Sequence, residues 1–108
     1  MKKLRKYEEV VKRGISVLDS CNSIHLRWRE RIDKNKISLL SSFHCPLGQL
    51  CGTYLKGLAI IHPLKATNKY YLWEKWAEKN GFSVGIRHPL NLYKENKFLV
   101  QEWKRQLG

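Results

Sequence analysis

The sequence predicts an all-α fold: about four helices in a compact orthogonal bundle, with an irregular segment between the first helix and the second. Apolar residues recur at steps of three and four along several stretches, which is the spacing of one face of an α-helix. Residues typical of helix boundaries, such as Pro46 and Asn80-Gly81, stand at the ends of those stretches. With 108 residues, 43% of them hydrophobic, the chain has room for one helical domain with one core, residues 1–108.

The first helix is expected at residues 3–19. Its apolar stripe consists of Leu4, Tyr7, Val11, Ile15 and Leu18. Gly14 lies inside this helix, where a glycine costs about 1 kcal/mol relative to alanine. We therefore expect another element to pack closely at that point.

Residues 24–43 follow no sustained period, although Trp28 and Ile32 could share a helical turn. Residues 33–36 are typical of a turn. The second main helix is expected at 45–61, with Ser41 or Ser42 as its cap. Because this stretch is apolar around most of its circumference, we expect it to be central and enclosed.

Two more helices are expected at 68–80 and 92–107, joined by a loop over 83–91 that contains His88-Pro89. Tyr71, Leu72, Trp76 and Ala77 would form the apolar face of the third helix. Asn80-Gly81 is a strong stop signal, after which Phe82 would fold back onto the helix end. In the last helix the aligned apolar residues are Leu92, Phe98, Leu99, Trp103 and Leu107.

The composition favours a cytoplasmic protein. The basic residues at the N-terminus precede no apolar signal-peptide region. The most apolar stretch, residues 55–64, is interrupted by charged and polar residues and is far shorter than the roughly 20 residues that cross a bilayer. Three cysteines, an odd number, do not suggest a disulfide framework. We expect no membrane contact, and the oligomeric state stays open.

Charge is the strongest functional signal. The chain has 21 Lys and Arg against nine Asp and Glu, a net charge of +12. Residues 1–36 hold eleven of the bases and five of the acids, so this third has twice the charge density of the rest. Such an excess attracts polyanions. Attraction to an acidic protein surface and simple solubility are the alternatives.

The predicted polyanion surface consists of bases on the first helix and on the 27–36 segment. Arginine in particular can hold a phosphate through two parallel hydrogen bonds. The residues are Lys2, Lys3, Arg5, Lys6, Lys12, Arg13, Arg27, Arg29, Arg31, Lys34 and Lys36. No helix-turn-helix, zinc-finger or RNA-recognition signature accompanies them, so sequence-specific reading is not expected.

Four more side chains are candidates for contact with a partner or ligand. Trp28 and Trp73 would be anchors on a protein partner if they are exposed, because tryptophans often dominate the energetics of interfaces. Gln49 and Tyr54 are polar groups on an otherwise apolar helix and could touch a ligand. An ordinary internal hydrogen bond is the simpler role for a buried tyrosine hydroxyl.

Cysteines and histidines suggest two further chemistries, both weaker than core packing. His44, Cys45, Cys51 and His62 are ligand types for zinc, but a spacing of six between the cysteines does not fit the usual pairs. Cys45 beside His44 at a helix start could be a reactive thiolate, because a helix N-terminus lowers a thiol pKa. No third residue that would orient such a pair is identifiable. We expect no metal, no cofactor and no catalytic residues.

The segment Cys45-Pro46-Leu47-Gly48-Gln49-Leu50-Cys51-Gly52-Thr53-Tyr54 resembles a motif, Cys-x-Leu-Gly-Gln-Leu-x-Gly-x-Tyr, of a family of small uncharacterised proteins of bacteria and their phages. Residues 28–33, 77–82 and the closing helix resemble the family too, so the likeness spans about residues 14–107. Cys51 replaces an expected aromatic residue, and this chain is more basic. The resemblance implies a small accessory protein, phage-borne or mobile-element-borne, with no assigned activity.

Three functions therefore stay open at this stage. The first is non-enzymatic binding of nucleic acid or another phosphate-rich polyanion, without strong sequence specificity. The second is a phage-type inhibitor that docks on a host defence or replication protein. The third is a pocket that binds a small phosphorylated ligand. All three depend on basic side chains gathering on one part of the surface.

Overall fold

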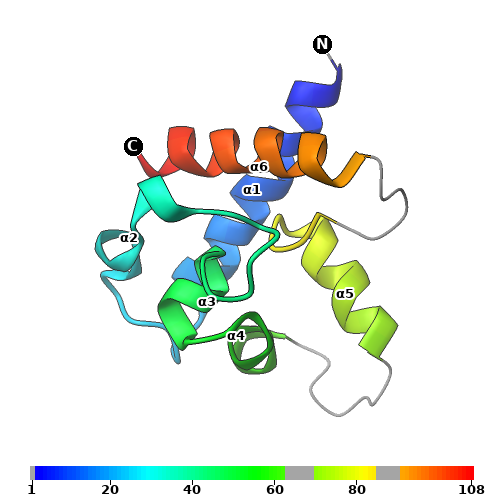
Figure 1. The fold of residues 1–108 in the computed structure, drawn as a ribbon. Coiled ribbons are helices and arrows are strands. Elements are labelled where there is room, and N and C mark those ends of the chain that lie inside the picture. The colour runs from blue at the N-terminus through cyan, green and yellow to red at the C-terminus, as the bar shows by residue number, and fades with distance from the viewer. Residues whose placement is uncertain (1, 63–69, 85–90) are drawn as a thin grey trace.

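The two longest helices form where the apolar stripes of the sequence are strongest. In this computed structural model, which describes residues 2–62, 70–84 and 91–108, they are α1, Lys2–Ser20, and α6, Leu92–Leu107. Figure 1 shows α6 crossing α1 steeply, with α5, Tyr70–Lys79, on one side. The shorter helices are α2, Trp28–Arg31, the 3₁₀ helix η1, Lys34–Lys36, α3, Pro46–Cys51, and α4, Tyr54–Ile61. The described residues contain no strand, so the all-α prediction is confirmed.

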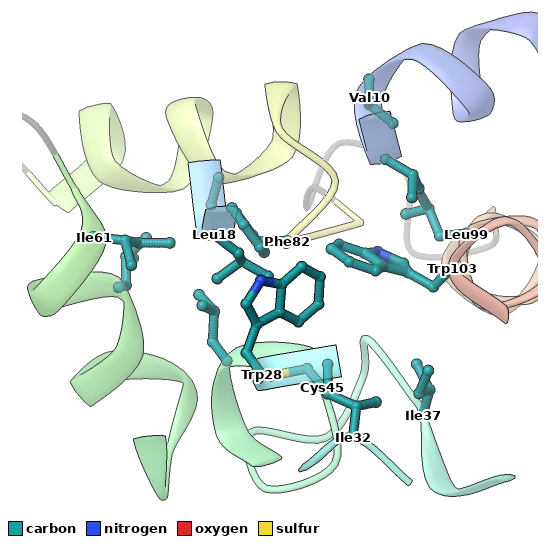
Figure 2. Close-up of a cluster of buried hydrophobic side chains, with 14 of the residues drawn as sticks. Val10, Leu18, Trp28, Ile32, Ile37, Cys45, Ile61, Phe82, Leu99 and Trp103 are labelled. Atoms are coloured by element: carbon teal, nitrogen blue, oxygen red, sulfur yellow. The ribbon is translucent and has the colours of Figure 1, made fainter. Parts of the chain in front are cut away.

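The core draws on almost every element. Figure 2 shows Trp28 of α2 and Trp103 of α6 reaching into the same interior, with Leu18 of α1 and Phe82 close to Trp28. Trp28, Trp103 and Phe82 are each at most 1% exposed. The radius of gyration is 12.9 Å, which matches the roughly 13 Å expected of a compact chain of this length.

Close packing at Gly14 is confirmed. A Cβ atom built there would lie 2.3 Å from the carbonyl oxygen of Asn80 and 3.1 Å from the ring of Trp103. The glycine therefore lets α1 approach both the end of α5 and the face of α6. The predicted stripe of α1 is buried at Tyr7, Val11 and Leu18.

The prediction of one continuous helix over 45–61 was wrong, because the chain breaks at Gly52. This residue ends α3 with φ +100°, a conformation that glycine adopts readily and other residues rarely do. The side chain of Thr53 then accepts a hydrogen bond from the amide of Lys56 at 3.2 Å and starts α4. Gly52 thus redirects the chain, whereas Gly48 is buried closely against the Ser42 carbonyl.

The end of α5 has the predicted stop. Gly81 has φ +76°, and the amides of Gly81 and Phe82 donate to the carbonyls of Glu78 and Ala77. These two bonds satisfy the last carbonyls of the helix and fold Phe82 back into the core. The predicted face was wrong at Tyr71, which is 63% exposed, whereas Trp73 is partly buried against the core. The predicted 83–91 loop, with His88-Pro89, lies mostly outside the described residues.

The irregular segment between α1 and α3 is confirmed, and it contains two short helical pieces. Trp28 and Ile32 are both buried, which fixes α2 against the core. The carboxylate of Asp33 accepts from the amide of Asn35 at 3.0 Å and starts η1 at the predicted turn. This segment then runs along α6, because the amide of Leu39 donates to the side chain of Asn96 at 2.7 Å.

Candidate polyanion-binding surface

The three alternating arginines of the 27–31 segment have different environments. Arg29 donates to both carboxylate oxygens of Asp19, at 2.9 and 3.0 Å, and its guanidinium lies 4.7 Å from the Trp28 ring. Arg27 lies 3.9 Å from Glu30 in an exposed ion pair. Arg31 has no ion pair or hydrogen bond within the described parts of the chain. Only Arg31 is therefore available to an outside anion without losing a carboxylate.

The predicted bases of α1 are largely offset or scattered. Lys12 lies 3.6 Å from Glu8, which also attracts Arg105 of α6 at 3.8 Å. Arg13 donates to the main-chain oxygen of Lys79 at 2.9 Å. Lys6 is exposed. The side chains of Lys2, Lys3 and Arg5 lie outside the described residues, so their part of the prediction stays a prediction.

Lys34 and Lys36 of η1 lie beside the C-terminal part of α6. The ammonium of Lys34 donates to the main-chain oxygen of Gly108, whose amide bonds the carbonyl of Lys104 at 3.2 Å. At the other end, the Leu39–Asn96 bond holds the same segment against the middle of α6. The two lysines are thus fixed next to the exposed side of a helix that has lysines of its own.

Those α6 lysines were absent from the sequence prediction. At 100° per residue, Lys94, Lys97 and Lys104 fall within about 80° of one another, on the side opposite the buried Leu99 and Trp103. All three are exposed and in no ion pair that involves described residues. The spacing was visible in the sequence. The prediction did not include these lysines because it was based on the higher charge density of residues 1–36.

The carboxylates of α6 are turned away from this row. Glu95 accepts a hydrogen bond from the hydroxyl of Tyr7 on α1. Glu102, whose side chain is 14% exposed, accepts from Arg105 and Gln106. Burial opposes ionisation of Glu102, but the bonds from Arg105 and Gln106 outweigh it and lower the pKa of its carboxyl. We call Lys34, Lys36, Lys94, Lys97 and Lys104 the lysine face.

Asp19 organises the region where α1 ends. Its carboxylate accepts from the indole of Trp28 at 2.9 Å as well as from Arg29. The bonds from Arg29, with a smaller effect from Trp28, hold the pKa of this carboxyl below its usual value. The prediction of Trp28 as an exposed anchor was therefore wrong, since one carboxylate and the core hold its ring inside.

Trp73, the other predicted anchor, is only partly exposed. It stacks on the buried ring of His62, with centroids 4.8 Å apart, and packs against the core. Tyr71 is the more accessible aromatic residue of α5. The side chain of Tyr70, next to it, lies outside the described residues.

Gln49 and Tyr54 have structural partners. The Gln49 side chain accepts from the amide of Asp33 at 2.7 Å and donates to the carbonyls of Asp33 and His44, at 3.2 and 2.8 Å. It thereby fastens η1 and the start of α3 to each other. The hydroxyl of Tyr54 donates to Glu74 at 2.6 Å, which connects α4 with α5. Both side chains therefore have internal partners, and the ligand contacts considered for them stay predictions.

Cys45 is the N-cap of α3, as its predicted place at a helix start implies. Its sulfur accepts from the amide of Gly48 at 3.3 Å, so Cys45 caps the helix in place of Ser41 or Ser42. Burial raises the pKa of this thiol and outweighs the bonds that would lower it. Cys45 is 2% exposed and is a packed thiol, contrary to the thiolate considered. Within the described ranges, no three His, Cys, Asp or Glu side chains gather to hold a metal ion.

Comparison with known proteins adds no relative. No protein-family profile, no curated protein and no solved structure matches the chain. In the part of the chain that the structure describes, no helix has the length and apolar character needed to cross a bilayer. Any function must therefore be argued from the surface itself.

Proposed function

We propose that this protein is a non-enzymatic accessory protein that binds nucleic acid, or another phosphate-rich polyanion, without strong sequence specificity. The observation that carries the proposal is the lysine face: bonds from Lys34 and Leu39 hold the η1 segment against α6. The two carboxylates of α6 are occupied by Tyr7, Arg105 and Gln106. Lysines in such a row attract a phosphate backbone, and the contacts carry no base information.

The dimensions of the lysine face suit a polyanion. Lys94 and Lys104 are ten residues apart on one helix, which at 1.5 Å per residue is about 15 Å. A DNA duplex has one phosphate charge per roughly 1.7 Å of its axis, so several phosphates fall within this length. Tyr93, which is 78% exposed, lies on the same side of α6, about 20° from Lys104 and 40° from Lys97 at 100° per residue. Its ring can stack on a base of any sequence while the lysines contact the backbone.

A titration of the full chain with fluorescent duplex DNA, single-stranded DNA and RNA tests the proposal. Affinity should fall steeply between about 50 and 200 mM salt, because binding would release counterions from the phosphates. Undetectable binding to all three polymers at the lower salt concentration contradicts the proposal.

Two matched variants locate the surface. The first replaces Lys34, Lys36, Lys97 and Lys104 with Gln, and the second replaces Lys6, Lys56, Lys75 and Lys79 with Gln. All eight residues are exposed, and both variants lose the same net charge. We expect the first variant to bind about 100-fold more weakly, and its slope of log affinity against log salt concentration to be smaller by about 3. The affinity and slope of the second variant should change far less. Equal losses of affinity in the two variants would show that binding depends on net charge alone.

A second function has its own observation, three exposed apolar side chains in one stretch of the chain. Residues 37–55 contain no charged side chain, yet Leu40, Phe43 and Leu55 are 42%, 63% and 54% exposed. The Tyr54 amide bonds the Ser42 carbonyl at 2.8 Å, which holds Phe43 and Leu55 near each other. A phage-type inhibitor that docks on a host defence or replication protein would use such exposed apolar side chains.

Affinity capture with purified protein after nuclease treatment separates the two functions. The inhibitor reading expects one stoichiometric host protein, lost in a Phe43→Ser, Leu55→Ser double variant and retained by the lysine-face variant. Retention of nothing after nuclease treatment would favour the polyanion reading. The phage-protein resemblance of residues 45–54 agrees with either function and stays a prediction.

A further inference from the structure

A pocket of about 380 Å³ lies where the loop after α1, the end of α2, the end of α3 and helix α4 meet. Its apolar floor includes Leu50 and Ile60, both partly buried. Pockets that hold small ligands are typically about 300 to 1,000 Å³, so this one suits a compact molecule and is too small for a polymer. It is separate from the lysine face, which runs along η1 and α6.

The polar residues that line the pocket can all donate hydrogen bonds. They are Asn22, Ser23, His25 and Arg31, and no carboxylate lines the pocket. The Nδ1 atom of His25 accepts a hydrogen bond from the amide of Arg27 at 3.0 Å. In the neutral ring the proton is therefore on Nε2, which remains a donor. Four donors above an apolar floor define a site for an anionic group on an apolar body.

Arg31 supplies the charge of this site. Its neighbours Arg27 and Arg29 are each held by a carboxylate, Glu30 and Asp19. Arg31 is in no ion pair with any described residue, although it lines a concave site. An unpaired guanidinium can bind a phosphate through two parallel bonds, which lysine cannot reproduce.

We propose that this pocket binds a small organic phosphate, a phosphate monoester carried on a compact apolar or aromatic body. Arg31 donates to two phosphate oxygens. The side chains of Asn22, Ser23 and His25 donate to the remaining oxygen lone pairs. The apolar body of the ligand packs on Leu50 and Ile60. Donors from three residues besides the arginine suit a phosphate, with its three terminal oxygens, better than a carboxylate with two. The proposal goes beyond the polyanion function and uses none of the lysine face.

The first test measures binding of a nucleoside 5′-monophosphate as the probe, by calorimetry and by backbone amide NMR. We expect saturable binding, with the largest amide shifts at residues 22–25 and 50–51. The variant Arg31→Gln should bind at least tenfold more weakly. The control Arg27→Gln removes another exposed arginine of the same segment but keeps the main-chain bond to His25, and its affinity should fall less than twofold.

Equal losses in Arg31→Gln and Arg27→Gln would overturn the proposal. So would binding of inorganic phosphate as tight as that of the monophosphate, since the apolar floor would then contribute nothing. Ser23→Phe, which fills the mouth without changing charge, should abolish binding while the unfolding temperature stays that of the wild type. The four-lysine variant of the lysine face should bind the probe normally, so failure of this proposal and failure of the polyanion function can be distinguished.

The second test uses the cysteines as reporters. Cys51 lines this pocket, whereas Cys21 lines the adjoining hollow, which shares Ile60 with it and lies beside Ile61 and His62. Saturating monophosphate should slow alkylation of Cys51 several-fold, read by peptide mass spectrometry, and leave Cys21 unchanged. Unchanged alkylation at both cysteines, with the probe shown to be bound, would place the ligand elsewhere and overturn the proposal.

Discussion

Helices α1 and α6 have the same proportion of bases to acids, yet they present different surfaces. The sequence of α1 has six bases and three acids, and that of α6 has four bases and two acids. On α1, Glu8 and Asp19 are 42% and 45% exposed and sit beside basic partners at the surface. On α6, Glu95 bonds Tyr7 of α1 and Glu102 bonds Arg105 and Gln106 of its own helix, which leaves Lys94, Lys97 and Lys104 unopposed. The direction of the carboxylates, more than the charge count, decides where a polyanion can bind.

The largest expected effect comes from breaking the contact that holds the two helices in place. In Gly14→Ala the new Cβ would lie 2.3 Å from a main-chain oxygen, so α1 must move away from α5 and α6. We expect a loss of about 3 kcal/mol in the free energy of unfolding, measured with urea and circular dichroism.

Gly52→Ala is the control for this prediction. Nothing lies within 4 Å of a Cβ atom there, but φ is +100°. Its cost should be about 1 to 2 kcal/mol, from backbone strain alone. A Gly14→Ala protein as stable as the wild type would mean that α1 is not held this closely.

The next effect converts α1 into a binding surface. In the double variant Glu8→Gln, Asp19→Asn, the bases Lys12 and Arg29 lose their carboxylates. We expect affinity for duplex DNA to rise by about tenfold at low salt and the salt slope to steepen, because two more bases can reach phosphates. Fluorescence anisotropy at two salt concentrations measures both quantities.

The matched control is Glu9→Gln, Glu78→Gln, which changes the net charge equally. Neither carboxylate has an ion pair or hydrogen bond within the described ranges, so this variant releases no base. If both double variants gain the same affinity, net charge explains the result and the contrast between the two helices does not.

A smaller effect concerns the pH dependence of stability at the end of α1. The pKa of Asp19 is lowered in the folded protein by Arg29 and Trp28. The contribution of the ionised Asp19 carboxylate to the free energy of unfolding is therefore complete above its unfolded pKa of about 3.9. It is lost as the pH falls toward the lower folded pKa. Because both partners are nearly half exposed, solvent screening limits the contribution to about 1 kcal/mol.

Urea unfolding of wild type and Asp19→Asn at pH 7, 5 and 3 checks this sign. The difference between the two proteins should be about 1 kcal/mol at pH 7 and pH 5 and should shrink at pH 3. A difference that stays constant down to pH 3 would show that the ionised carboxylate contributes nothing.

Features that depend on residues close in sequence could be predicted, whereas pairings between distant residues could not. The stripe of α1, the packing at Gly14 and the stop at Asn80-Gly81 depend on residues close in sequence, and all three predictions are confirmed. The break at Gly52 sits inside a stretch whose apolar period continues across it, so periodicity could not reveal it.

The candidate site shows the same division. Burial of Trp28 and neutralisation of Arg29 both depend on Asp19, nine and ten residues earlier in the chain, and no sequence spacing announces that pairing. The inward turn of Glu95 depends on Tyr7, 88 residues away. By contrast, the lysine row of α6 is a local pattern and could have been predicted from its spacing alone.

The smallest expected effect is also the most direct comparison of the two helices. Lys12→Gln and Lys104→Gln each remove one exposed lysine and one charge. Because Glu8 already offsets Lys12, its loss should change DNA affinity less than twofold, whereas Lys104→Gln should lower affinity about fivefold at low salt. Anisotropy titrations of both variants under one condition resolve this difference. Equal losses would mean that a polyanion responds to total charge, and the arrangement of the carboxylates on α1 and α6 would then have no bearing on binding.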